Sequence, residues 1–594
     1  MSVNTFKEDE EQKEVLKKET LIRLYRYLLS YKKQIVIVLL IMVLTIGITM
    51  ANPLIIERAI DVHIANKNLK GLVELGIFAV VLNVIYVLGV KLRMYLMAKM
   101  SNEILVTIRN ELYEHIQKLG FGFFDSRPTG KILARVIGDV NALKSVLSNS
   151  VTTLIPDFFT VIAVAIIMMV KNMKLALSAF IMLPFLIVGM YVIQTFSHKR
   201  WQILRKKNSN LNAFVHENLS GIRIVQSFTA EQESAENFDW LLKEQKKAYV
   251  GAVSLGDSFG SLIELTWGAG GFLLYYIGIK VIGVGEIGIG TFMAFSTYIS
   301  MFWSPIRNLA NFYNNIVTNI SAAERIFDIL DTEPEIMDQE GVEELPDIKG
   351  EVEFEHVSFS YNDESDKYVL DDVSFQIKPG ETIALVGPTG AGKTTIVNLI
   401  SRFYDSKKGR VLIDGYDIKE VSLYSLRRQM GIMTQDNFLF SGTIKDNIRY
   451  GKLNATDEEI IAAAKAVNAH DFIMKLEKGY DTEISERGAR LSIGQRQLLA
   501  FARTMVSEPR ILILDEATSS IDTHTEILVQ QGIEELLKGR TSFVIAHRLS
   551  TIKKADKIFV VDKGKICEAG NHEELMERKG AYYELYQAQF RSIA

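Results

Sequence analysis

The stretch Gly387-Pro-Thr-Gly-Ala-Gly-Lys-Thr-Thr395 follows the apolar run 383–386 and precedes the helix-compatible run 396–400. An apolar strand, a glycine-rich loop and a helix in this order are typical of a P-loop. The glycines let successive backbone N–H groups turn toward a phosphate, and a helix starting at Lys393 adds its positive N-terminal end. A glycine-rich turn before an ordinary helix is the alternative. We expect a nucleotide site formed by Gly387, Pro388, Thr389, Gly390, Ala391, Gly392, Lys393, Thr394 and Thr395.

Two side chains of this loop are expected to contact the nucleotide and its cation. Lys393 would place its charge on the β and γ phosphates. The hydroxyl of Thr394 would contact Mg²⁺, because a hard cation prefers oxygen ligands. The expected cofactors are therefore ATP and Mg²⁺.

Two further apolar runs also end in polar residues. Residues 511–514 end at Asp515 and Glu516, and residues 542–546 end at His547. Buried parallel strands have this pattern, and ligands bind at their carboxyl ends, so the three clusters should converge on one site. Asp515 would hold Mg²⁺, directly or through water, and Glu516 would polarise the attacking water. The two carboxylates could instead cap a helix.

Composition indicates a membrane part joined to a soluble part. The 594 residues are too many for one core, and 48% of them are hydrophobic although 23% are charged. The net charge of -4 shows no basic excess, which argues against nucleic acid as a partner. The single Cys567 excludes an intrachain disulfide and is consistent with a reducing cytosolic face.

The first half of the sequence predicts a transmembrane domain over residues 1–330. Residues 20–33 read as an interfacial elbow helix, and the charged residues before them give no sign of a cleavable signal peptide. Six spans are expected in a bilayer with a hydrocarbon core of roughly 30 Å. They lie near residues 35–56, 71–95, 151–170, 175–196, 258–282 and 287–306.

Charge and periodicity orient these spans. The long segments 91–150 and 197–257 are rich in Lys and Arg, so both segments and both termini should lie in the cytosol of a bacterium. Helical spacing over residues 103–118 predicts helices that extend beyond the bilayer. The pattern breaks at 120–130, which carries three phenylalanines, and again near 210–221. We interpret the aromatic break as a docking knuckle for another domain.

The second half reads as a different kind of domain. An acidic stretch over 331–348 is the expected linker, and from Val352 short apolar runs alternate with helical patterns. This alternation predicts an α/β domain with a largely parallel sheet over residues 349–594. The fold class is thus an all-α six-helix transmembrane domain with cytosolic helical extensions, followed by an α/β P-loop ATPase domain.

The segment Leu491-Ser-Ile-Gly-Gln495, about twenty residues before Asp515, resembles the signature motif of ABC transporter ATPases. With six spans ahead of the ATPase, the chain resembles a half-transporter of the bacterial type IV exporter group, which moves drugs and lipids. The resemblance covers nearly the whole chain.

The resemblance implies roles for further residues. Tyr361 matches the A-loop aromatic that stacks on adenine, Gln435 the Q-loop, Asp522 in Ser520-Ile-Asp522 the D-loop, and His547 the switch histidine. Residues 486–488 resemble the X-loop, and 124–130 and 212–221 resemble the coupling helices. The expected catalytic residues are then Glu516, His547 and Gln435. The expected metal ligands are Thr394, Gln435 and Asp515. The expected ATP-binding residues outside the P-loop are Tyr361, Ser492, Gly494, Gln495 and Asp522.

In this family the signature helix presents Ser492 and backbone amides to a nucleotide on the opposite subunit, so the resemblance implies a dimer. Two departures bear on its partner. Ile493 stands where the consensus has glycine, and Leu499 follows Leu498 where the consensus has arginine and an aliphatic residue. A β-branched residue at 493 could also crowd the helix N-terminus. With Glu516 intact, this favours the competent subunit of a heterodimer, and a homodimer stays open.

The expected function is ATP-driven export of small amphipathic molecules, drugs or lipids across the cytoplasmic membrane. A homodimeric lipid or peptide exporter, and an ATP-gated channel or sensor on the same fold, are the alternatives. Two interpretations of Asp257 and Glu264 stay open, attraction of cations or a position in water at the cytosolic mouth. A set of aromatic residues could line a substrate pocket or only pack the helices. This set comprises Tyr275, Tyr276, Phe292, Phe295, Tyr298 and Phe302.

Overall fold

The chain divides into two compact units, each described here by itself. The computed structural model describes residues 18–282, 288–338, 341–361, 367–434, 437–485, 488, 490–515, 523–546 and 549–590. The first unit comprises Met1–Gln117 and Thr129–Thr332, and the second comprises Lys118–Pro128 and Glu333–Ala594. A helical unit followed by a β-containing unit is the predicted fold class, and it is confirmed. The predicted bounds of the transmembrane domain, 1–330, included 118–128, although the aromatic break at 120–130 was interpreted as a docking knuckle for another domain.

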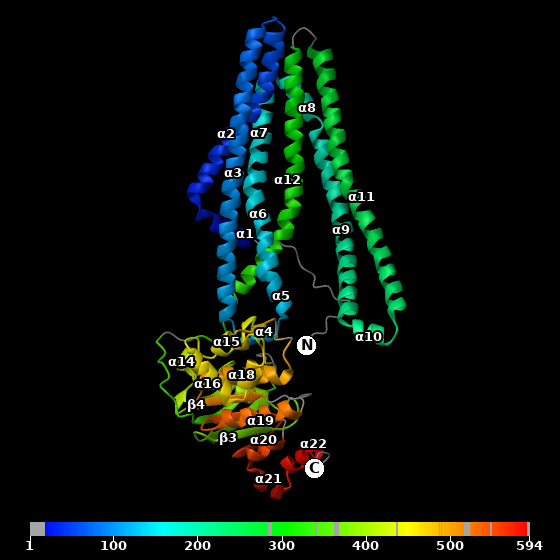
Figure 1. Ribbon diagram of the computed structural model, residues 1–594. Helices are drawn as coiled ribbons and strands as arrows, with labels where there is room; N and C mark the ends of the chain where they lie inside the picture. The colour runs from blue at the N-terminus through cyan, green and yellow to red at the C-terminus, as the bar shows by residue number, and fades with distance from the viewer. Residues whose placement is uncertain are drawn as a thin grey trace. The chain divides into compact units, whose positions relative to one another are not determined.

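The described part of the first unit is helical throughout (Figure 1). Its α-helices are α1 (Lys18–Leu29), α2 (Lys32–Arg58), α3 (Leu69–Lys118), α5 (Thr129–Leu133), α6 (Val140–Asn149), α7 (Ile155–Lys171), α8 (Met173–Phe180), α9 (Leu183–Ser220), α10 (Ile222–Ser227), α11 (Glu231–Ile277) and α12 (Ile289–Leu330). Wider π-helical turns join several of them, at Ala59–Ile64, Ala134–Asp139, Ser150–Leu154 and Gly278–Ile282.

Among the described residues, five helical stretches are long and apolar enough to cross a membrane. They are Lys32–Ile64, Leu69–Lys118, Thr152–Lys171, Met173–Ser220 and Glu231–Lys280. Each contains most of one of the first five predicted spans. The sixth predicted span falls largely on α12, which is not among these five in the described part of the chain. Hydroxyl-bearing residues lower the hydropathy of α12, so the sixth span stays a prediction.

The elbow helix predicted over 20–33 is divided between two helices, α1 and the start of α2. Helix α1 ends at Leu29, and α2 already begins at Lys32. The N–H of Tyr31 donates to the carbonyl of Leu28 at 2.9 Å, which closes a turn between them. On the α1 side, Arg23 donates to both carboxylate oxygens of Asp331 at 2.6 and 2.8 Å and lies over the ring of Phe327. The elbow is thereby tied to the end of α12.

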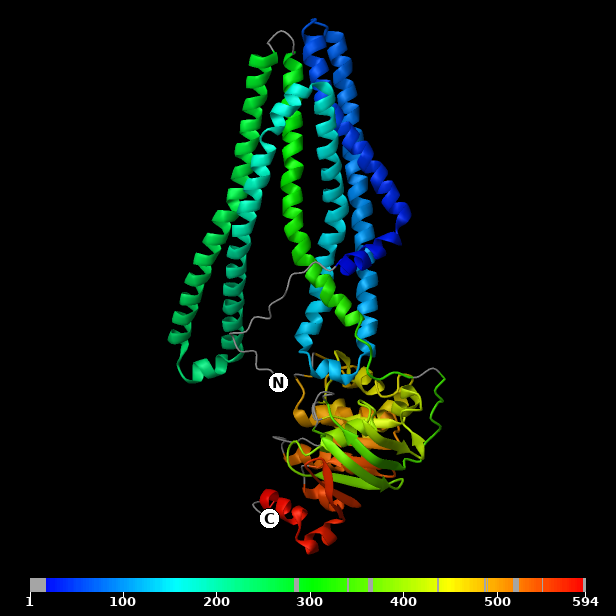
Figure 2. The same ribbon diagram turned by 180° about the vertical axis from the view of Figure 1, so that it is seen from behind.

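Helices α9 and α11 run side by side, and α10 closes the pair at one end (Figure 1, Figure 2). Lys207 pairs with Glu244 at 2.9 Å, and the rings of Phe214 and Phe238 stack with centroids 6.5 Å apart. These cross-helix contacts keep α9 helical to Ser220. The predicted break over 210–221 is therefore wrong for most of its length and falls only at Gly221.

The aromatic set of the last predicted span mainly packs the helices. Phe295 and Tyr298 are fully buried, and the Tyr298 hydroxyl donates to the carbonyl of Met50 at 2.8 Å. Phe302 packs at 5.2 Å from the ring of Phe180. Asp257 and Glu264 are exposed along α11. The aromatic residues were expected either to line a substrate pocket or to pack the helices. The contacts of Phe295, Tyr298 and Phe302 show helix packing for these three buried rings.

The second unit contains two main sheets. The larger has the order β12-β11-β3-β10-β9-β6, and all its neighbours are parallel except β12 and β11. This confirms the predicted largely parallel sheet. The strands are β3 (Thr382–Val386), β6 (Met430–Met433), β9 (Ile511–Asp515), β10 (Thr541–Ile545), β11 (Lys557–Asp562) and β12 (Lys565–Gly570).

A four-stranded antiparallel sheet, with the order β2-β1-β4-β5, was not predicted. Figure 2 shows it in yellow-green on the near side of this unit. Its strands are β1 (Val352–Phe359), β2 (Leu370–Ile377), β4 (Lys408–Ile413) and β5 (Tyr416–Asp417). A short pair, β7 (Gly442–Thr443) and β8 (Glu483–Ile484), completes the strands of the described residues.

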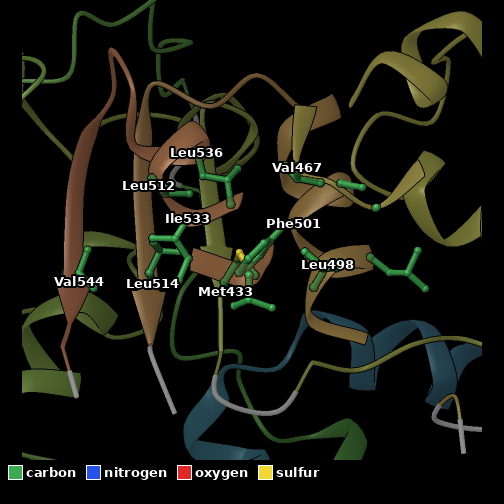
Figure 3. Packing of buried hydrophobic residues seen from close by; sticks show 14 of the residues in the cluster. Met433, Val467, Leu498, Phe501, Leu512, Leu514, Ile533, Leu536 and Val544 are labelled. Atoms are coloured by element: carbon green, nitrogen blue, oxygen red, sulfur yellow. The ribbon is translucent and has the colours of Figure 1, made fainter. Parts of the chain in front are cut away.

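The parallel strands are buried on both faces, which explains their unbroken apolar runs. Along β9, Leu512 and Leu514 face one hydrophobic cluster, whereas Ile511 and Ile513 face the other. Figure 3 shows the first cluster, in which Leu498 and Phe501 gather with residues of β9 and β10. The helices of this unit are α4 (Phe121–Asp125), α13 (Lys393–Ile400), α14 (Leu423–Arg428), α15 (Ile444–Arg449), α16 (Asp457–Ala466), α17 (His470–Met474), α18 (Ile493–Val506), α19 (Thr523–Leu537), α20 (Leu549–Lys554), α21 (His572–Arg578) and α22 (Ala581–Phe590).

The predicted linker packs onto this unit over much of its length. Leu345 and Ile348 are buried in the second cluster. The N–H of Leu345 donates to the hydroxyl of Ser425 at 2.8 Å, and that of Ile348 donates to the side chain of Gln429 at 2.9 Å. The acidic stretch 331–348 was predicted as the linker, and its apolar residues Leu345 and Ile348 fold with the ATPase unit.

Candidate nucleotide site

The carboxyl ends of three strands meet at one edge of the parallel sheet. Strand β10 lies between β3 and β9, with Ile545 in register with Leu385 on one side and Asp515 on the other. The predicted convergence of these strand ends is confirmed. Glu516 and His547, which follow β9 and β10, lie outside the described residues. So do Gln435, after β6, and Asp522.

At two positions the glycine-rich loop has a backbone conformation that only glycine can adopt. Gly387 has φ +147°, and a Cβ added there would lie 2.1 Å from the carbonyl oxygen of Val561. Gly392 has φ +110° and is the last residue before α13, which begins at Lys393 as predicted. Glycine is required at both positions, because one is sterically closed and both have left-handed or otherwise rare φ values.

Lys393 is held inside the loop it belongs to. Its ammonium donates to the carbonyl oxygens of Gly387 and Pro388 at 2.8 and 2.9 Å. Burial lowers the pKa of Lys393, and the negative charge of Asp515 opposes that shift. A phosphate bound at the loop would add negative charge and so favour the charged amine further.

Oxygen donors suitable for a hard cation lie at the same edge. Thr394 is exposed in the first turn of α13, and Asp515 ends β9 near enough to Lys393 to act on its charge. Among the described residues, no group of three or more His, Cys, Asp or Glu side chains could hold a metal. This sparse set fits Mg²⁺, which commonly takes one or two protein oxygens and completes its shell with phosphate oxygens and water.

Tyr361 is placed beside α13. Its hydroxyl is 3.1 Å from the hydroxyl of Thr395, and half of its surface is exposed. Its ring lies edge-on to Phe359 and Tyr404, with centroids 4.8 and 5.0 Å away. Because Phe359 and Tyr404 cover only part of the Tyr361 ring, its exposed surface is available for a planar base to stack on.

The signature segment forms the capped start of α18. The hydroxyl of Ser492 accepts from the N–H of Gln495 at 3.2 Å, and the Gln495 side chain accepts from the N–H of Ser492 at 3.0 Å. This reciprocal capping box orders the helix N-terminus. Ile493 begins the helix with 46% of its surface exposed, and Gly494 is buried. Within this chain, Ile493 therefore does not crowd the N-terminus.

The knuckle residues contact a surface that sequence reasoning did not single out. The ring of Phe121 lies 4.3 Å from that of Phe403, and the hydroxyl of Tyr404 donates to Asp125 at 2.5 Å. Phe123 is buried, whereas Phe124 is 40% exposed. The available signal was the aromatic pair 403–404 directly after α13, but nothing in the sequence linked it to a segment so far upstream.

A P-loop at the edge of a parallel sheet, joined to a unit whose described residues include five apolar helical stretches of membrane-spanning length, is typical of a membrane-bound nucleotide-binding protein. Residues 35–306 match the family model described as ABC transporter transmembrane region, and residues 370–519 match the model described as ABC transporter.

Individual proteins match over most of the chain. The uncharacterized ABC transporter ATP-binding protein YknV of Bacillus subtilis is 41% identical over 580 residues, covering 96% of this chain and 94% of that protein. The ATP-dependent lipid A-core flippase of Syntrophus aciditrophicus is 42% identical over 500 residues, covering 84% and 82%. A solved bacterial Atm1-family ABC exporter with ATP bound has a TM-score of 0.79 at 29% identity, covering 95% and 99%.

The chain belongs to the ABC transporter family. It is accordingly an ATP hydrolase whose activity is coupled to transport, with the exporter fold.

Proposed function

We propose that this chain is one half of a dimeric exporter that moves small amphipathic molecules, drugs or lipids across the bacterial cytoplasmic membrane. The observation that carries the proposal is the P-loop, in which Lys393 donates to the Gly387 carbonyl and is close enough to Asp515 for that carboxylate to act on its charge. The same chain has, among its described residues, five apolar helices of membrane-spanning length. A similar protein is named a lipid A-core flippase, and another is named an ABC exporter. Basic segments beside the spans favour a cytosolic ATPase unit and cytosolic termini.

Each nucleotide contact has a proposed residue. Tyr361 stacks on adenine, the loop 387–395 surrounds the phosphates, and Lys393 pairs with the β and γ groups. Mg²⁺ would be held by Thr394, Asp515 and Gln435, and when bound it would neutralise charge developing on the phosphates. Glu516 orients and polarises the attacking water. His547 and Gln435 complete the catalytic set, and Asp522 contacts ATP.

The dimer follows from the signature segment. Ser492 and Ile493 are exposed at the start of α18, where the helix offers N–H groups and a positive dipole end to an anion. We propose that Ser492, Gly494 and Gln495 contact a nucleotide bound by the partner subunit. Two ATPase units would then close around two nucleotides, and hydrolysis would weaken the closed state and let the membrane parts reset.

The assembled transporter in proteoliposomes tests this function. We expect MgATP to drive uptake of a fluorescent amphipathic dye, such as Hoechst 33342, into vesicles whose ATPase units face outward. A gated channel would instead pass the dye down its gradient with a non-hydrolysable ATP analogue. Flux without hydrolysis would favour that alternative.

The second prediction concerns the partner subunit, which we expect to be a different half-transporter. We expect the chain purified alone to show at least about tenfold less ATPase activity than a co-expressed pair, because removing a catalytic contact typically costs 10²–10⁴-fold. In the pair, this chain's Lys393, Asp515 and Glu516 form the hydrolysing site, while its own Leu491-Ser-Ile-Gly-Gln495 completes a weaker one. The measurement is ATPase activity alone and with a co-expressed half-transporter from the same genome.

Exchanging Ile493 for glycine is the matched variant for this test. If the partner's site is weak because of Ile493, Ile493→Gly should raise turnover of the pair. A single chain that forms a stable homodimer and hydrolyses ATP as fast as any pair would overturn the heterodimer and leave the exporter function standing.

A third prediction concerns the knuckle. Phe121→Ala removes the ring that packs on Phe403 at 4.3 Å and leaves the P-loop untouched. We expect basal ATPase activity within about twofold of wild type and dye transport lowered by roughly fivefold, since an aromatic pair contributes about 0.5–1.5 kcal/mol beyond its area. Tyr424→Ala, at an exposed ring of the same unit, is the control. Transport that falls only in step with ATPase activity would contradict a coupling role.

A further inference from the structure

Tyr404 lies between the proposed adenine side of the nucleotide site and α4. Its ring meets the ring of Tyr361 edge-on, with centroids 5.0 Å apart and planes at 89°. Its hydroxyl donates to Asp125 of α4 at 2.5 Å. Tyr361 is in turn tied to α13 through Thr395, at 3.1 Å. The Tyr404 side chain therefore contacts both Tyr361, which matches the A-loop aromatic, and α4.

The surroundings of Tyr404 restrict how it can move. It is 8% exposed, and Phe359 packs on it with centroids 5.6 Å apart. Burial raises the pKa of Tyr404, and the hydrogen bond to Asp125 raises it further. The charged and titratable groups that act on it are Asp125, Tyr361 and Glu335. The phenol thus keeps its proton at neutral pH and donates to Asp125 throughout the working range.

The docked end of α4 leaves little room for an independent shift. Glu335 lies so close that a Cβ on Gly122 would be 2.8 Å from its carboxylate. Phe121 is packed on Phe403, over which the guanidinium of Arg427 lies 5.2 Å from the ring centroid. Because α4 is fixed at both ends, a displacement of the Tyr404 hydroxyl must either move α4 or break the bond to Asp125.

We infer that Tyr404 is a positioning residue that communicates adenine occupancy at Tyr361 to α4 through its hydrogen bond to Asp125. This inference rests on the proposed function and adds to it a route from the base. Adenine stacked on Tyr361 restricts that ring, whose edge contact restricts Tyr404. The route starts at the base and not at the γ-phosphate, so α4 receives a signal that phosphate binding alone does not produce.

A fluorophore on α4 tests the route directly. Cys567 is the sole cysteine, so Cys567→Ser with Ser126→Cys gives one labelling position next to Asp125. In the assembled transporter, bimane at this position should change its emission when MgATP binds. Inorganic tripolyphosphate with Mg²⁺, at saturation measured by competition, should produce a much smaller change because it lacks the base.

Tyr404→Phe is the decisive variant, because it removes only the hydroxyl. We expect it to reduce the ATP-induced emission change and the dye transported per ATP by roughly three- to tenfold, the size expected for a typical net hydrogen bond. The KM for ATP should stay within about twofold, since the ring edge against Tyr361 remains. Tyr416→Phe removes a hydroxyl from an exposed tyrosine of the same unit and should change neither reading.

Asp125→Ala supplies an independent variant at an exposed position, in case Tyr404→Phe reduces folding. It should match Tyr404→Phe, and the double variant should be no worse than either, because both remove one bond. Additive losses, an unchanged emission response in Tyr404→Phe, or an equal response to tripolyphosphate would each overturn the inference. So would no ATP response of the label in a transporter that exports dye. Absence of dye export by the wild type would count instead against the proposed function.

Discussion

Glu516→Gln is expected to leave ATP binding close to wild type and to reduce hydrolysis by roughly 10²–10⁴-fold. The amide keeps the shape of the side chain but cannot accept a proton from the attacking water, and general base catalysis typically contributes a factor of that size. The position follows β9, whose end lies in register with Ile545 of β10. Turnover of the assembled transporter and its affinity for ATP are the two measurements.

Glu477→Gln is the matched control, at an exposed glutamate of the same unit. It should leave both measurements unchanged. Hydrolysis by Glu516→Gln at the wild-type rate would show that another group activates the water. Loss of ATP affinity in Glu516→Gln would show that the carboxylate has a binding role instead.

Lys393→Ala is expected to fail at an earlier step, with ATP affinity lowered by roughly 10–100-fold, the value of a hydrogen bond to a charged phosphate. The ammonium now donates to the Gly387 and Pro388 carbonyls, so it is already positioned at the mouth of the loop. Equilibrium binding of a fluorescent ATP analogue measures the loss. Lys465→Ala, at an exposed lysine on α16, is the control.

The two variants separate binding from chemistry. A phosphate contact made in the ground state should affect affinity, whereas a group needed only in the transition state should affect turnover. If Lys393→Ala binds ATP as tightly as wild type while turnover falls, the lysine acts only on the transition state. Near-normal binding and turnover would remove Lys393 from the site.

The elements around the P-loop could be predicted because their residues are adjacent in the sequence or belong to buried strands. The run 383–386 and the loop after it specify a strand, a turn and a helix start, and all three lie where they were expected. The convergence of β3, β9 and β10 followed from the burial of parallel strands alone.

The antiparallel sheet was missed for a physical reason. Its strands mix buried and exposed positions, as in β2, where Leu370, Val373 and Ile377 are buried between polar neighbours. Such irregular alternation resembles loop sequence when the partner strands are unknown. The predicted break over 210–221 began too early, because α9 continues to Ser220 with cross-helix contacts that depend on residues of α11.

Docking of the knuckle also depended on distant residues. The three phenylalanines of the break at 120–130 indicated a contact with another domain but not which of its residues they contact. The hydrogen bond that fixes α4 joins residues 279 positions apart, and neither Asp125 nor Tyr404 has a local pattern that signals the other.

This separation also sets an order of events on the ribosome. Segment 118–128 emerges long before Tyr404 is synthesised, and at bacterial elongation rates of about 5–20 residues per second the wait is on the order of tens of seconds. Phe121 lacks its partner ring, Phe403, during that interval. Completion of the ATPase unit is therefore also the step that covers the aggregation-prone ring of Phe121 in the nascent chain. Truncated products that end before Phe403 would leave that ring uncovered.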